Sequence, residues 1–216
     1  MPQAELVEID CWIFDLDNTL YPPSAGLFHQ IDKRMTDFIR RELSVARSHA
    51  NELRDAYWRA HGTTMAGLAV HHGIKPEQFL TETHDLDYSG LKHESALAKA
   101  IHSLPGTKLV HTNGPRCHAD AVLKALRYDG LFSQVYALED ANLVSKPSPD
   151  AFKAVYSKAG IDPARSAMIE DDARNLIVPH ALSVRTIWLD HHGVEPNPHH
   201  VHHRIKDLTE FLESLV

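Results

Sequence analysis

The sequence predicts an α/β fold in which a parallel β-sheet is interrupted by a helical insertion. Short apolar segments of the kind that form buried parallel strands recur along the chain. Segments with the apolar spacing of helices lie between them. About ninety residues separate the first apolar segment from the second, whereas a crossover between parallel strands needs only about a dozen. The long connection therefore holds an inserted unit.

Five apolar segments are the predicted strands, and several of them end at turn or acidic residues. They are Cys11 to Phe14, Lys108 to His111, Gln134 to Ala137, Ala167 to Ile169 and Val184 to Leu189. Two helices between them are predicted from the apolar stripes Ala119, Val122, Leu123, Leu126 and Phe152, Val155, Tyr156, Ala159. Gly160 ends the second of these, because glycine readily closes a helix. A final helix is predicted from Leu208 to Leu215.

The insertion is predicted to be all-helical. Apolar residues with helical spacing open it, namely Leu27, Phe28, Ile31, Met35, Phe38 and Ile39. The same spacing recurs at Leu53, Ala56, Tyr57 and Ala60. No alternating pattern typical of strands occurs in this stretch. We therefore assign residues 22–91 to a helical domain, and residues 1–21 and 92–216 to the α/β core.

Composition and charge argue against several classes of protein. An apolar share of 43% among 216 residues suffices for one ordinary core with an insertion. The 22 basic residues are outnumbered by 29 acidic ones and form no basic cluster, which argues against a nucleic-acid polymer as partner. No window approaches the roughly 18 apolar residues of a membrane span. Two cysteines make no disulfide framework and the start MPQAELVEID has no signal pattern, so we expect a cytoplasmic location.

Polar residues that can carry chemistry follow three of the predicted strands. They are Asp15, Asp17 and Thr19 after the first, Thr112 and Asn113 after the second, and Glu170, Asp171 and Asp172 after the fourth. The carboxyl ends of parallel strands meet at one edge of the sheet, where ligands bind in open α/β folds. Carboxylates gathered there would repel one another unless a cation joined them, and oxygen ligands suit Mg²⁺. The sequence therefore predicts a Mg²⁺ site at this edge.

Lys146 and Gly114 indicate that the same edge binds an anion. Pro147 disfavours helical backbone at Lys146. Ser148 and Pro149 are suited to cap and begin a helix, so the lysine stands just before a helix N-terminus. Gly114 lets backbone amide groups approach a ligand closely. Features for an anion beside features for a cation predict a phosphorylated substrate together with Mg²⁺.

Four short motifs occur in order along the chain. They are Asp15-Leu-Asp17-Asn-Thr19-Leu20, His111-Thr112-Asn113-Gly114, Lys146-Pro-Ser-Pro-Asp-Ala-Phe152 and Glu170-Asp171-Asp172-Ala-Arg-Asn175. Together they resemble the four ordered motifs of the haloacid dehalogenase superfamily. The stretch Tyr57 to Asp85 resembles the helical cap of the pyrimidine 5'-nucleotidase branch of its phosphatases. The resemblance implies a Rossmann-like, three-layer core and an all-helical cap that closes over the substrate and excludes water.

The resemblance also implies which residues act on the phosphoryl group. Asp15 resembles the nucleophile that forms an aspartyl-phosphate, and Asp17 resembles the general acid and base. The reaction requires such a pair, because one carboxylate attacks phosphorus while the other protonates the leaving alkoxide and then activates water. Thr112 and Asn113 would bind phosphoryl oxygens, and Lys146 would offset the charge of the phosphoryl group and of the nucleophile.

A metal site is implied in the same way. The ligands of Mg²⁺ would be Asp171, a side-chain oxygen of Asp15 and the main-chain carbonyl of Asp17. Asn175, four residues beyond Asp171, would support that site from the first turn of the next helix. The acidic triplet leaves open which of Glu170, Asp171 and Asp172 contacts the metal. Asp171 is preferred because of its spacing to Asn175, and Asp172 is predicted to cap the helix.

We therefore expect a Mg²⁺-dependent phosphomonoester hydrolase that acts on a small phosphorylated metabolite, with a pyrimidine nucleoside 5'-monophosphate as the favoured substrate. A phosphotransferase or sugar-phosphate mutase with the same aspartyl-phosphate is one alternative. A non-catalytic nucleotide-binding regulator is another, although four intact motifs argue against it. Carbon–halogen cleavage is disfavoured because, as the resemblance implies, that branch lacks the second acid supplied here by Asp17.

Some other features are better explained by structure than by function. Six of the seventeen histidines lie between His191 and His203, where a solvated loop before the final helix is favoured over a transition-metal site. Tyr57, Trp58 and Phe79 lie in stretches with helical spacing, so we expect them in the core rather than stacked on a nucleobase.

Overall fold

The computed structural model describes residues 6–193 and 196–216. The chain divides into two compact units, residues 1–22 with 91–216 and residues 23–90. The first unit contains the β-sheet, and the second consists of helices. None of the helices in the described ranges is both long and apolar enough to cross a membrane.

The core unit is built on a six-stranded sheet in the order β3-β2-β1-β4-β5-β6, with parallel pairing throughout. The strands are β1 (Cys11–Phe14), β2 (Thr107–His111), β3 (Gln134–Tyr136), β4 (Ser166–Glu170), β5 (Arg185–Leu189) and β6 (His203–Ile205). The order runs from β1 to β2 and β3 on one side, and from β4 to β5 and β6 on the other. β1 and β4 are therefore the neighbours at which the strand order reverses, and open α/β sheets bind ligands beyond the carboxyl ends of such strands.

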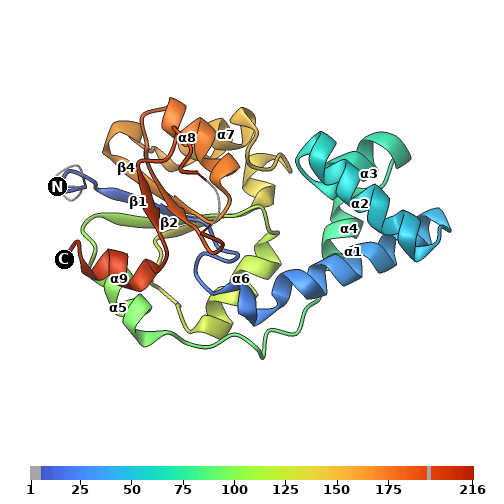
Figure 1. Ribbon diagram of the computed structural model, residues 1–216, viewed down its shortest axis with the longest axis horizontal. Coiled ribbons are helices and arrows are strands. Elements are labelled where there is room, and N and C mark those ends of the chain that lie inside the picture. Colours follow the sequence, from blue (N-terminus) through green and yellow to red (C-terminus); the bar gives the residue numbers. More distant parts are fainter. Residues whose placement is uncertain (1–5, 194–195) are drawn as a thin grey trace. The chain divides into compact units, whose positions relative to one another are not determined.

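Helices cover both faces of this sheet and complete a three-layer, Rossmann-like core (Figure 1). They are α5 (Ser95–Ser103), α6 (Arg116–Leu126), α7 (Pro149–Ala159), α8 (Ile177–Ala181) and α9 (Leu208–Glu213), with 3-10 turns at Leu138–Ala141, Pro163–Arg165 and Ala173–Leu176. In Figure 1, α7 and α8 lie on one side of the strands, and α5 and α9 on the other. Ile13 and Met168 from adjacent strands pack in one buried cluster with Phe152 of α7. The pleat sends every second strand residue to this face, which gives the face its apolar layer.

The five predicted strands are confirmed to within one residue at each end. The segment His191–His203, predicted as a solvated loop, is irregular and mostly exposed in its described residues before His203, which begins β6. Residues 194–195 of this segment lie outside the described residues. Two of its histidines make contacts with the core that the prediction did not include. The Nε2 atom of His200 lies 2.8 Å from the Ala173 carbonyl oxygen, and the Nδ1 atom of His202 lies 2.7 Å from the Thr186 hydroxyl oxygen. A three-residue strand is too short to show a period in the sequence. No three metal-ligating side chains meet in this segment within the described part of the chain.

The second unit is the predicted helical insertion. Its helices are α1 (Leu27–Leu43), α2 (Arg47–His61), α3 (Thr64–His72) and α4 (Pro76–Thr83), preceded by a 3-10 turn at Pro23–Ala25. Phe38 of α1 and Phe79 of α4 meet edge to face with ring centroids 5.2 Å apart. Gly67 of α3 lies against Tyr57 of α2 so closely that a Cβ atom there would be 2.3 Å from the tyrosine Cβ. Glycine thus permits the tight crossing of these two helices.

The aromatic residues of this unit divide between core and surface. Phe79 is 1% exposed, as predicted for a core residue. Trp58 is 45% exposed, so its prediction as a core residue is wrong. Tyr57 packs on α3, and neighbouring residues of a helix point about 100° apart, which turns Trp58 away from that contact.

Candidate active site

Three carboxylates converge where β1 and β4 end. Asp15 follows β1, Glu170 is the last residue of β4, and Asp171 comes next. One oxygen from each lies within 4.8 Å of the others. The register of the parallel pair sets Phe14 opposite Ile169, and the Asp15 amide donates to the Ile169 carbonyl over 2.9 Å. Strand pairing therefore brings together acids that are more than 150 residues apart in the sequence.

Lys146 is buried among these acids, with 1% of its surface exposed. Its Nζ atom lies 2.7 Å from Asp15 Oδ1, 2.7 Å from Glu170 Oε1 and 2.8 Å from the His111 carbonyl oxygen. Three acceptors use the three protons of the ammonium group. The backbone of Lys146 is held by Asn113, whose side chain accepts from the Lys146 amide over 2.7 Å and donates to its carbonyl over 3.0 Å. Hydrogen bonds therefore hold both the ammonium group and the backbone of Lys146 in place.

Burial and mutual repulsion raise the pKa of two of the carboxyl groups. At Asp15 the main cause is burial away from water, and the negative charge of Glu170 raises the pKa further. Lys146 lowers it, and the resulting pKa is about 8. The pKa of Asp171 rises to about 9, again mainly through burial, with Glu170 and Asp15 adding. Burial by itself would lower the pKa of Lys146, but Asp15 and Glu170 raise it above its ordinary value. When all three carboxyl groups are ionised, they and the one ammonium group leave two negative charges, and these oxygen donors fit a hard divalent cation such as Mg²⁺.

The acidic triplet at the end of β4, Glu170 to Asp172, makes different contacts at each position. Glu170 accepts from Lys146, from the Asn175 side chain over 2.7 Å and from the Asp172 amide over 2.9 Å, so its oxygens are largely committed to protein donors. Asp172 pairs with Arg174 and caps the following 3-10 turn, as predicted. Asp171 accepts from the Asn18 side chain over 3.3 Å. Asn175 supports the cluster through Glu170 and lies in a 3-10 turn, whereas the sequence suggested support beside Asp171 in a helix.

Asp17 is held by two residues that the sequence reasoning missed. Its Oδ1 atom accepts from the Tyr21 hydroxyl and lies 2.7 Å from Nε2 of His118, in the first turn of α6. Its Oδ2 atom lies 3.5 Å from the Thr112 hydroxyl, which also accepts from the Gly114 amide over 2.9 Å. Tyr21 follows Asp17 by four residues in a turn, a spacing that could have drawn attention to it. Nothing in the sequence indicates the pairing with His118.

The predicted phosphate-binding residues also gather at this edge of the sheet. Thr112 approaches Asp17, and Lys146 contacts Asp15. The side chain of Asn113 is engaged with the Lys146 backbone through both of its polar atoms. Its evident task is to hold the lysine in place, which the sequence did not suggest.

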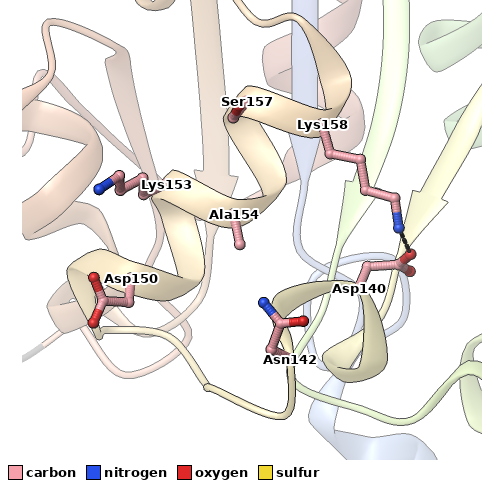
Figure 2. A pocket seen from close by; sticks show the side chains of 7 residues that line it. All are labelled: Asp140, Asn142, Asp150, Lys153, Ala154, Ser157 and Lys158. Atoms are coloured by element: carbon pink, nitrogen blue, oxygen red, sulfur yellow. Dashed lines mark hydrogen bonds and ion pairs between the residues drawn. The ribbon is translucent and has the colours of Figure 1, made fainter.

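A surface hollow of about 550 Å³ lies elsewhere in the core unit, between α7 and the 3-10 turn Leu138–Ala141 (Figure 2). It is lined by Asp140, Asn142, Asp150, Lys153, Ala154, Ser157 and Lys158. Figure 2 shows Lys158 paired with Asp140 at its rim. The hollow contains neither the acidic cluster nor Lys146, so the candidate active site is the carboxyl edge of β1 and β4.

The chain is thus an α/β protein with a buried centre of three carboxylates and one lysine at the carboxyl edge of its parallel sheet. The family of haloacid dehalogenase-like hydrolases matches residues 9–178, and the chain belongs to this family. Among curated proteins, Phosphate metabolism protein 8 of Saccharomyces cerevisiae is 26% identical over 178 residues. The match covers 74% of this chain and 55% of the yeast protein, so the chain spans about half the length of that relative.

Solved structures of the same fold include enzymes of more than one activity. A HAD phosphatase from Thermococcus onnurineus has a TM-score of 0.65 at 16% identity, with 96% of this chain and 98% of that chain covered. The HAD-hydrolase YfnB from Bacillus subtilis, bound to magnesium, has a TM-score of 0.63 at 15% identity, with 96% and 98% covered. The L-2-haloacid dehalogenase from Xanthobacter autotrophicus has a TM-score of 0.57 at 12% identity, with 95% and 97% covered. The fold is therefore compatible with both phosphatase and dehalogenase activity, and the residues of the site must distinguish these two activities.

Proposed function

We propose that this chain is a Mg²⁺-dependent phosphomonoester hydrolase that works through an aspartyl-phosphate on Asp15. The observation that carries the proposal is the second carboxylate, Asp17, held in place two residues further on. A phosphate ester leaves as an alkoxide that must be protonated, whereas a halide leaves without a proton. A second acid beside the nucleophile therefore favours phosphate esters over carbon–halogen bonds.

The reaction has two steps. A carboxylate oxygen of Asp15 attacks phosphorus, the bond from phosphorus to the ester oxygen breaks, and Asp17 gives its proton to the leaving alkoxide. A water molecule then attacks the aspartyl-phosphate, its proton passes to Asp17, and the bond from Asp15 to phosphorus breaks to release inorganic phosphate. The Thr112 hydroxyl and the main-chain amide of Asn113 would bind the phosphoryl oxygens, because the Asn113 side chain holds the Lys146 backbone. The positive charge of Lys146 stabilises the charge that develops on these oxygens.

The metal would be held by side-chain oxygens of Asp15 and Asp171 and by the main-chain carbonyl of Asp17. When bound, Mg²⁺ would supply positive charge to the transferring phosphoryl group and balance the crowded carboxylates. The oxygen-only donor set and the excess of negative charge support Mg²⁺. Asn175 would orient Glu170, and through it Lys146.

Mg²⁺ is expected to stabilise the protein more at pH 8 than at pH 6. Without metal, the folded chain binds protons at Asp15 and Asp171 that the unfolded chain releases, since the folded pKa values of about 8 and about 9 lie above the ordinary 3.8. The free energy of unfolding therefore falls as pH rises from about 4 towards these values. Mg²⁺ displaces those protons, so its own contribution grows over the same range.

This expectation is checked by melting temperatures with EDTA and with Mg²⁺ at the two pH values. Asp171→Asn should lose the gain from Mg²⁺. Asp172→Asn is the matched control, because Asp172 pairs with Arg174 and should keep the gain. An equal gain at both pH values, retained in Asp171→Asn, would contradict the assigned metal site.

We further propose that the substrate is a pyrimidine nucleoside 5'-monophosphate or a similar small phosphorylated metabolite. The support is the resemblance of residues 57–85 to the pyrimidine 5'-nucleotidase cap, together with the phosphate-metabolism relative. Residues 22–91 would serve as the cap that selects the substrate, and residues 1–21 with 92–216 as the catalytic core. A cytoplasmic location is proposed from the two free cysteines, Cys11 and Cys117.

The test is release of free phosphate from pyrimidine and purine nucleoside monophosphates, sugar phosphates and phosphoglycolate, with and without Mg²⁺. Uridine and cytidine monophosphates are expected to exceed the other substrates in kcat/KM by about tenfold or more, a ratio that needs only about 1.4 kcal/mol of selective binding. Preference for another substrate would overturn the nucleotidase assignment alone. Transfer of phosphate to a second hydroxyl instead of water would indicate a phosphotransferase or mutase, and no turnover of any substrate would favour a non-catalytic regulator.

A further inference from the structure

We propose that Tyr21 and His118 form a clamp that orients Asp17 for proton transfer, and that Asp17 transfers its proton through Oδ2. The inference rests on the proposed function, since it concerns the acid of that reaction. Both residues are positioning residues, because they act through Asp17. Neither belongs to the four motifs from which the function was predicted.

Two buried donors converge on one carboxylate oxygen. His118 is fully buried and Tyr21 is 4% exposed. Nε2 of His118 lies 2.7 Å from Asp17 Oδ1, and the Tyr21 hydroxyl donates to the same oxygen. When Asp17 is ionised its Oδ1 atom can only accept, so in that state Nε2 of His118 carries the ring proton. A proton on Oδ1 would collide with both donors. Oδ2 lies 3.5 Å from the Thr112 hydroxyl, which can rotate to accept, so we assign the proton that Asp17 exchanges with substrate and water to Oδ2.

The clamp comes from two segments that are far apart in the sequence. Tyr21 returns to Asp17 through a tight turn with Asn18 in the left-handed region, in which the Leu20 amide donates to the Leu16 carbonyl over 2.9 Å. His118 comes from α6, 101 residues beyond Asp17. Donors from two independent elements restrict rotation of the carboxylate, which keeps the acid aligned with the leaving oxygen.

Gly114 is part of the same arrangement. A Cβ atom at this position would lie 2.9 Å from Cδ2 of His118 and 3.5 Å from Asp17 Oδ2. Only a residue without a side chain lets the imidazole reach the carboxylate. The glycine that the sequence associates with anion binding thus also makes room for the clamp.

Substrates with different leaving groups distinguish a positioning role of Tyr21 and His118 from a purely structural role. Protonation matters little for p-nitrophenol, which leaves readily as its anion, and greatly for an alkyl alcohol. We therefore compare kcat/KM for p-nitrophenyl phosphate with kcat/KM for an alkyl ester, either glycerol phosphate or the best nucleoside monophosphate. His118→Phe is expected to lower the alkyl value by about 100-fold and the aryl value by less than tenfold, as a displaced catalytic group costs about that much. Tyr21→Phe should shift the ratio in the same direction, by about tenfold.

Rescue and control variants complete the test. His118→Gln restores an N–H near the position of Nε2 and should recover at least tenfold of the alkyl loss. Tyr128→Phe removes a buried hydroxyl that donates to the Glu94 carbonyl and should leave the ratio unchanged. Equal losses on both substrates, or no rescue by glutamine, would overturn the clamp. If His118→Phe does not fold, Tyr21→Phe and His118→Gln decide the matter.

Asp17→Asn separates failure of the clamp from failure of the proposed function. It should show the largest selective loss on the alkyl ester if Asp17 is the acid. A selective loss in Asp17→Asn without one in the clamp variants would overturn the clamp alone. No selective loss in Asp17→Asn would overturn the acid role on which the clamp depends.

Discussion

Asp15→Asn is expected to lower phosphate release by about 10⁴-fold or more, because an amide oxygen cannot serve as the attacking nucleophile. The fold should be retained. An asparagine oxygen can still accept from Lys146, and the change removes one of three crowded carboxylates. The measurement is kcat for an aryl phosphate with saturating Mg²⁺, alongside the melting temperature.

Asp10→Asn is the control for this variant. Asp10 directly precedes β1 and forms an exposed ion pair with Arg165, so its loss should leave kcat within about twofold and cost no more than about 1 kcal/mol of stability. Trapping of ³²P-labelled protein after acid quench gives a second readout, expected in the wild type and absent in Asp15→Asn. Turnover of Asp15→Asn within a few-fold of wild type would refute Asp15 as the nucleophile.

Lys146→Met is expected to destabilise the fold by about 3–5 kcal/mol as well as to abolish turnover. The ammonium is buried between Asp15 and Glu170, and its removal leaves both carboxylates without their cation in a site from which water is excluded. Lys146 lowers the pKa of Asp15, so without the lysine this pKa rises further. The loss of stability should therefore be greater at pH 8 than at pH 6, where protonation relieves the unpaired charge.

Urea denaturation of the metal-free protein at both pH values measures this effect. The double variant Lys146→Met with Glu170→Gln should regain part of the stability but none of the activity, since it removes one unpaired charge and restores no cation. Lys158→Met is the matched control, because its exposed pair with Asp140 is worth about 0–1 kcal/mol. A Lys146→Met protein as stable as wild type at pH 8 would show that the buried ion pairs are not what holds this centre together.

Much of the site could be predicted because its residues directly follow apolar strands. Asp15, Thr112 and Asp171 each come after a segment whose burial is visible in the sequence, and parallel strands place their carboxyl ends together. The role of Glu170 within the acidic triplet, as a partner of Lys146, could not be predicted. Which carboxylate receives Lys146 depends on the direction of each side chain where the strand ends, and the sequence does not report that direction.

The sequence by itself determined the α/β class, the helical insertion, the residues at the carboxyl edge of the sheet, and five of the six strands found in the described part of the chain. These follow from local periodicity and from short motifs, which are properties of neighbouring residues. Only the tertiary structure decided that Lys146 is shared by Asp15 and Glu170, that Asn113 holds the lysine backbone, and that His118 contacts Asp17. Such contacts depend on strand order and register, which join residues far apart in the chain, and no local pattern encodes them.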